Sequence, residues 1–163
     1  MKIGAMNSPK NKLMDEIRWI SENGFDFIDL TIEPFGAYRF DVGKVKNMLK
    51  DFNLGVVGHT NPFLPSIFPI PSIRKVCLKE FKRYAEIFGR LGADRMNIHP
   101  FYGPPIFSDE ERIRENISFL KEVNKFCASR GIALMLENFV RPFDKPKVFK
   151  RILKEVPGLR VHL

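Results

Sequence analysis

The 163-residue sequence predicts an α/β fold, namely a TIM-type (β/α)8 barrel that is incomplete, with about five and a half strand–helix units present. Short, nearly continuous apolar segments alternate with longer segments whose apolar residues recur at helical spacing. This alternation is typical of parallel strands joined by helices. No G-x-G-x-x-G or Walker A pattern points to an open nucleotide-binding sheet. A closed barrel takes about 250 residues, so we expect residues 1–163 to be a single domain that lacks the C-terminal strands.

Each of the first three units pairs an apolar segment with an amphipathic one. Residues 2–6 predict a strand, and the apolar spacing that begins at Leu13 predicts a helix ended by Asn23-Gly24. Residues 27–32 predict the second strand, and Asp41 suits the N-cap of a helix that reaches residue 52. Residues 54–58 predict the third strand. After a proline-rich loop, Ser72 can cap a helix with the apolar stripe Ile73, Val76, Cys77, Tyr84, Ile87, Phe88 and Leu91.

The later units repeat the same order. Residues 95–98 predict the fourth strand, and Ser108 followed by Glu111 forms a capping-box pattern at the start of the fourth helix. Residues 132–136 predict the fifth strand, with a helix over residues 147–155 behind it. Pro157-Gly158 then introduces a sixth apolar segment, residues 159–163.

Composition and charge bear on location and partners. No apolar run approaches the roughly 20 residues of a bilayer span, and the N-terminus lacks a signal-peptide core, so we expect a cytoplasmic protein with no membrane partner. Cys77 and Cys127 fall on apolar helix stripes and are expected to be buried hydrophobes. The formal charge of +8 is compatible with an anionic partner. The densest cluster is nevertheless interrupted by apolar residues, as on a solvated helix face: Arg141, Lys145, Lys147, Lys150, Arg151 and Lys154.

Three residues of metal-binding type follow successive strands. His59, His99 and Glu137 come directly after the third, fourth and fifth expected strands. Active sites of TIM barrels lie at these strand ends, where two imidazoles and a carboxylate can bind one divalent ion such as Zn, Mn, Co or Fe. A carboxylate directly after an apolar strand is also costly to bury without a partner. We therefore expect the three side chains to converge on a divalent metal ion, with Glu137 also catalytic.

Further polar residues are candidates for substrate binding. Glu33 shares one face of the second strand with Asp29 and Thr31, and it reaches the barrel mouth if that face points inward. A basic partner in the loop is the alternative for Glu33. Asn138 and Arg141 follow Glu137 closely enough to bind hydroxyl or phosphate oxygens. A surface ion pair explains Arg141 as well.

Four segments also carry a family resemblance: Gly24-Phe25-Asp26-Phe27-Ile28-Asp29-Leu30, Gly58-His59-Thr60, Asn97-Ile98-His99-Pro100 and Leu136-Glu137-Asn138. In order and spacing they resemble the xylose isomerase-like TIM-barrel superfamily, which includes sugar-phosphate isomerases and epimerases as well as endonuclease IV. By this resemblance, Glu137 is similar to the fifth-strand metal carboxylate of both branches. His59 and His99 are similar to histidines that bind metal in the endonuclease branch.

The sequence also departs from that family pattern. The sixth strand typically continues into an Asp-x-x-His motif, and residues 159–163 resemble only the approach to it. Arg141 and Asp144 resemble an arginine and a second carboxylate of epimerase-like members, but Pro142 disturbs the spacing. Asp29 stands where relatives commonly have glutamate.

The resemblance and the expected site favour a metal-dependent isomerase or epimerase acting on a sugar or sugar phosphate. The reaction would move a proton beside a carbonyl through a metal-stabilised enediolate. The alternative from another class is an endonuclease IV-like phosphodiesterase acting on abasic DNA, supported by the two histidines and the positive charge. A third reading is an inactive fragment. We expect the 163-residue chain alone to be inactive, and a homo-oligomer is compatible with the sequence.

Overall fold

Six parallel strands form one sheet in the order of the chain, from β1 to β6. The computed structural model describes residues 1–33 and 37–162. The strands are β1 (Gly4–Met6), β2 (Phe27–Thr31), β3 (Gly55–His59), β4 (Arg95–Ile98), β5 (Ala133–Glu137) and β6 (Arg160–His162). The helices between them are α1 (Leu13–Glu22), α2 (Val42–Asp51), α3 (Pro71–Leu91), α4 (Asp109–Ala128) and α5 (Pro146–Glu155).

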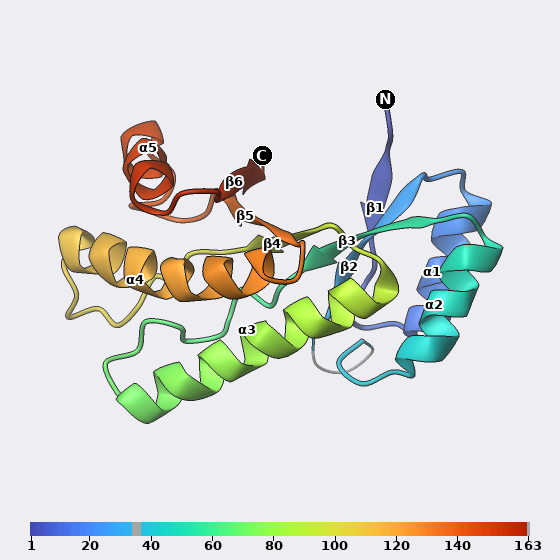
Figure 1. Ribbon diagram of the computed structural model, residues 1–163, viewed down its shortest axis with the longest axis horizontal. Coiled ribbons are helices and arrows are strands. Elements are labelled where there is room, and N and C mark those ends of the chain that lie inside the picture. Colours follow the sequence, from blue (N-terminus) through green and yellow to red (C-terminus); the bar gives the residue numbers. More distant parts are fainter. Residues whose placement is uncertain (34–36, 163) are drawn as a thin grey trace.

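The expected α/β fold, part of a TIM-type barrel, is confirmed. Each helix packs beside the next one along the chain, so the helices form a row that follows the sheet from α1 and α2 at one end to α4 and α5 at the other (Figure 1). Sequential parallel strands with helices along one side are the repeating arrangement of such a barrel. Among the described helices, none combines the length and the apolar character needed to cross a membrane.

Most expected helix starts hold, and one is wrong. The side chain of Asp41 accepts a hydrogen bond from the backbone N–H of Lys44, and Ser108 with Glu111 forms the capping box at the start of α4. Ser72 does not cap α3, because that helix begins one residue earlier at Pro71. Proline suits the first helical position, since its missing N–H would have no partner there.

The apolar stripe expected along α3 is also wrong at one position. Val76 is 67% exposed, whereas Cys77 and Phe81 are buried. The buried face continues through Tyr84 and Phe88, at helical spacing from Cys77. Val76 lies about 100° around the helix from Cys77 and so points into solvent. Both cysteines are buried as expected, and burial raises the pKa of the Cys127 thiol to about 12.

The two faces of the sheet have different roles. In β2, β4 and β5 every second side chain is fully buried in the hydrophobic core against the helices, as with Ile28, Met96 and Leu134. The alternate residues point to the opposite face. That face carries a row of register partners in which His59 lies between Thr31 and Asn97. Polar chemistry is therefore concentrated on the face that the helices do not cover.

Gly58 allows Phe88 of α3 to lie directly against β3. A Cβ added at Gly58 would come within 2.4 Å of the Phe88 ring, and Phe88 is completely buried. We expect Gly58→Ala to lower the free energy of unfolding by about 1–3 kcal/mol through overpacking. Gly89→Ala is the matched control, because its Cβ would make only an ordinary 3.5 Å contact on an exposed part of α3. Urea unfolding should show the control to be neutral or stabilising, and equal stability of both variants would contradict this account.

Candidate metal centre

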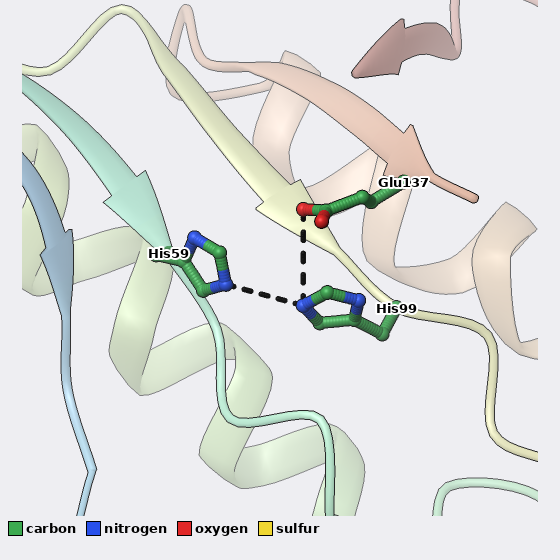
Figure 2. Close-up of side chains that lie close together, drawn as sticks. All are labelled: His59, His99 and Glu137. Carbon is green, nitrogen blue, oxygen red and sulfur yellow. Dashed lines mark hydrogen bonds and ion pairs between the residues drawn. The ribbon is translucent and has the colours of Figure 1, made fainter. Parts of the chain in front are cut away.

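The three candidate ligands meet at the C-terminal ends of neighbouring strands. His59 is the last residue of β3 and Glu137 the last residue of β5, while His99 follows β4 directly. Figure 2 shows the two imidazole rings and the carboxylate turned toward one another from these three strands. One potential ligand atom from each residue lies within 4.8 Å of the other two. The expected convergence is therefore present, and metal binding itself remains a prediction.

The spacing of the donor atoms fits a divalent ion. The Nε2 atoms of His59 and His99 are 3.1 Å apart, and His99 Nε2 lies 3.8 Å from Glu137 Oε2. Ligands about 2.0–2.1 Å from a tetrahedral zinc ion are about 3.4 Å from one another. The observed separations fall on either side of that value. The third separation, between His59 and Glu137, is within 4.8 Å, so two neutral imidazoles and one carboxylate could close around one ion by side-chain movements.

Asn97 lies between two of the candidate ligands and contacts both His59 and Glu137 through its side-chain amide. Its side chain is completely buried, and its Oδ1 accepts a hydrogen bond from the backbone N–H of Thr60 at 3.0 Å. This bond fixes the orientation of the amide, because Nδ2 in the same place would face another donor. Nδ2 is thereby directed toward Glu137 Oε2 at 2.6 Å and toward the Nδ1 of His59 at 2.9 Å. A short hydrogen bond to the carboxylate holds Glu137 in the cluster.

The pKa values of His59 and His99 are shifted in opposite directions. Burial lowers the pKa of His59, but the hydrogen bond and charge of Asp29, with Glu137 and Glu33 adding to them, leave that pKa above its ordinary value. Burial also lowers the pKa of His99, and the attraction of Glu137 does not offset it. Since the neutral imidazole is the form that binds a metal, the lowered pKa of His99 favours ligation.

The structure places the three expected substrate-binding residues differently. Glu33 is half-buried, accepts a hydrogen bond from Thr31 and contributes to the raised pKa of His59, so it lies beside the cluster. Asn138 is exposed immediately after β5. Arg141 is 80% exposed and lies 3.5 Å from Asp144. The structure thus places Glu33 beside the histidines and Asn138 next to the candidate ligand Glu137, and the alternative of a surface ion pair describes the geometry of Arg141.

Sequence reasoning gave no site role to Asn97, Asp29 or His162, yet all three contact the cluster. Asp29 Oδ2 lies 3.0 Å from His59 Nδ1, and His162 Nδ1 lies 3.0 Å from Glu137 Oε2. The available signal was strand periodicity, because Asn97 of β4 comes two residues before His99, and residues two apart along a strand share one face. Register was the missing information. Glu137 pairs with His162 and His59 pairs with Asn97, which the sequence does not state.

The fold and the family profile agree. The profile of the xylose isomerase-like TIM barrel matches residues 17–163, and the chain belongs to this family. The curated protein sequences contain no significant match to the chain.

Solved structures of sugar epimerases share the fold. Methylomonas sp. D-allulose 3-epimerase has 18% identity and a TM-score of 0.81, covering 100% of this chain and 62% of that protein. A D-tagatose 3-epimerase-like protein has 22% identity and a TM-score of 0.87, with 99% and 64% covered. D-psicose 3-epimerase from Clostridium cellulolyticum H10 has 16% identity and a TM-score of 0.79, with 99% and 62% covered. The chain therefore spans 62–64% of the length of these structures.

Proposed function

We propose that this chain carries the N-terminal part of a metal-dependent isomerase or epimerase acting on a sugar or sugar phosphate. The observation that supports this most strongly is the convergence of His59, His99 and Glu137 at the strand ends of a xylose isomerase-like barrel. Active sites in TIM barrels are built at this end of the strands. The similar solved structures are named as sugar 3-epimerases, which favours this reaction class over others on the same fold.

In this proposal His59, His99 and Glu137 hold a divalent ion of the Zn, Mn, Co or Fe type. A bound divalent ion would polarise the carbonyl of an open-chain sugar and stabilise enediolate charge. Asn97 holds the Glu137 carboxylate in place through its 2.6 Å hydrogen bond. Glu137 is also the proposed catalytic carboxylate, because a carboxylate beside the candidate metal position can move a proton of a substrate bound there.

Substrate contacts in this proposal come from the residues around the cluster. Glu33 lies beside the histidines, and the hydrogen bond from Thr31 holds one of its oxygens in place. The carboxylate has further acceptor sites that can receive hydrogen bonds from sugar hydroxyls. Asn138 follows the ligand Glu137 and is exposed to solvent, where an amide can bind a hydroxyl. Arg141 is free to bind a phosphate only by leaving Asp144, and exposed ion pairs of this kind are weak.

An endonuclease IV-like phosphodiesterase is the second candidate. Its support is the donor set, since two histidines beside a carboxylate can hold an ion that activates water against a phosphate. The basic residues give it less support. Arg151 of α5 is bound to Glu110 and Glu155 on the outer helices, which matches a solvated helix face rather than a DNA-binding surface.

One set of assays separates these functions. A panel of ketoses, aldoses and their phosphates, together with abasic-site DNA, should be tested with each divalent metal on the 163-residue chain and on any longer reading frame that contains it. We expect metal-dependent sugar turnover by the longer protein and none by the 163-residue chain. Cleavage of abasic DNA without sugar turnover would favour the second candidate.

Metal binding is expected to weaken at a higher pH than it would with an ordinary histidine ligand. A proton and a metal ion compete for the same imidazole nitrogen, and the pKa of His59 is raised above its ordinary value of 6.5. Metal affinity should therefore be fully present only above this raised pKa and decline as the pH falls through it. Zinc titrations between pH 5 and about 8.5, with proton release followed in weakly buffered solution, measure the effect. Affinity that is constant down to the lowest pH would contradict histidine ligation.

A further inference from the structure

Asp29 contacts Nδ1 of the His59 ring, the nitrogen that faces away from the candidate metal position. Its Oδ2 lies 3.0 Å from His59 Nδ1, while His59 Nε2 faces His99 at 3.1 Å. The side chains of His59 and Asp29 are 11% and 19% exposed, so water screens their interaction only weakly. Asp29 pairs with Val57 across β2 and β3, which makes it a diagonal neighbour of His59 on the same face.

Two tautomers of His59 compete in this arrangement. Asn97 Nδ2 is a donor only 2.9 Å from His59 Nδ1, and its orientation is fixed by the backbone N–H of Thr60. If Nδ1 accepted that hydrogen bond, the neutral ring would carry its proton on Nε2 and could not bind a metal there. If Nδ1 instead donates to Asp29, the Nε2 lone pair is left facing the metal position.

The carboxylate decides between the two tautomers. A hydrogen bond to a charged acceptor is roughly twice as strong as one between neutral groups. Asn97 loses little when His59 donates to Asp29, because Nδ2 has a charged acceptor in Glu137 Oε2 at 2.6 Å. The balance therefore favours the form of His59 that carries its proton on Nδ1.

The other oxygen of the Asp29 carboxylate has no partner in the described part of the chain that would explain its burial. Oδ1 is buried and has no hydrogen-bond partner among the described residues. An unpaired buried carboxylate oxygen costs stability, and a role at a functional site is one explanation for such a cost. The carboxylate interacts with the His59 ring through its other oxygen, Oδ2.

We propose that Asp29 is a positioning residue that holds His59 in the tautomer with the proton on Nδ1 and presents Nε2 to the metal ion. This inference rests on the proposed metal centre. It goes beyond that centre by assigning the selection of the ligand form to a residue that does not itself bind the metal. Outer carboxylates of this kind typically change metal affinity by about 10–100-fold.

The test combines zinc titration with nitrogen NMR of the histidines. The chain has only three histidines, so ¹⁵N-histidine labelling gives three ring systems, and His162→Gln helps to assign them. In the unsubstituted chain we expect the proton of His59 on Nδ1, before and after zinc is added. In Asp29→Ala we expect the proton to shift toward Nε2 and zinc affinity to fall by about 10–100-fold. Asp29→Asn should lie between the two, because its amide oxygen still accepts a hydrogen bond.

Glu33→Gln is the matched control for charge. Glu33 also raises the pKa of His59, but no hydrogen bond joins the two described side chains. We expect Glu33→Gln to leave the His59 tautomer unchanged. An equal tautomer shift in Glu33→Gln and Asp29→Ala would assign the effect to general charge and overturn the proposal.

The outcomes also separate the positioning role from the metal centre. A His59 ring in the unsubstituted chain with its proton on Nε2 would overturn the role of Asp29, whether or not the Asp29 variants fold. Unchanged zinc affinity in a folded Asp29→Ala would overturn it as well. If zinc shifted none of the three ring systems in the unsubstituted chain, the metal centre itself would be contradicted, and the role of Asp29 with it.

Discussion

Glu137→Ala is expected to abolish divalent-metal-dependent turnover in the active protein while leaving the fold intact. The substitution removes one of three converging ligands and no part of the hydrophobic core, since Glu137 is half-buried at the end of β5. Loss of residues that merely support a ligand costs about 10–100-fold in affinity, so loss of a ligand should cost at least the upper end of that range. Metal content after dialysis and turnover rates measure the loss of function, and circular dichroism measures whether the fold stays intact.

Glu122→Gln is a suitable control, because Glu122 is an exposed residue of α4 that lies outside the cluster. It should bind metal and turn over substrate as the unsubstituted protein does. Glu137→Gln adds a version that keeps the side-chain volume and loses only the charge, and it should be as impaired as the alanine variant. Full activity in either Glu137 variant would contradict the proposed role.

The second large effect concerns the 163-residue chain when it is produced alone. In the sheet of the described residues, β1 and β6 each have one hydrogen-bonded neighbour. Unpaired strand edges are templates for pairing with another chain. We therefore expect concentration-dependent association in sedimentation experiments. Because the chain spans only 62–64% of the length of the similar barrels, we also expect weak metal affinity and no measurable turnover.

Val161→Lys tests the edge at β6 directly. Val161 is 36% exposed and pairs with Leu136, away from the face that carries His162 and Glu137. A lysine at an exposed edge opposes strand pairing, so association should weaken while metal affinity stays the same. A monomeric, cooperatively melting and catalytically active 163-residue protein would show that these strands form a self-sufficient architecture and would contradict this expectation.

The fold was readable from the sequence because the dominant signals are local. Apolar strands, helical periodicity and the caps at Asp41 and Ser108 each depend on a few neighbouring residues. The errors at Ser72 and Val76 arose where competing local choices exist, since Pro71 can start a helix as well as Ser72 can cap one. The residue at which α3 begins depends on how this helix packs against the sheet.

The candidate ligands were also readable, whereas their supporting residues were not. His59, His99 and Glu137 share a position relative to their own strands, which a sequence displays. The roles of Asp29 and Asn97 depend on contacts across strands, with partners 30 to 40 residues away. Those contacts are set by the register of the sheet and by the orientation of one buried amide. Neither leaves a local pattern.

Anomalous X-ray diffraction at the zinc absorption edge tests the central claim most directly. Crystals grown with zinc should show an anomalous peak about 2.0–2.2 Å from the Nε2 atoms of His59 and His99 and from a carboxylate oxygen of Glu137. Occupied zinc sites found only elsewhere on the molecule, with these three side chains unliganded, would contradict the account.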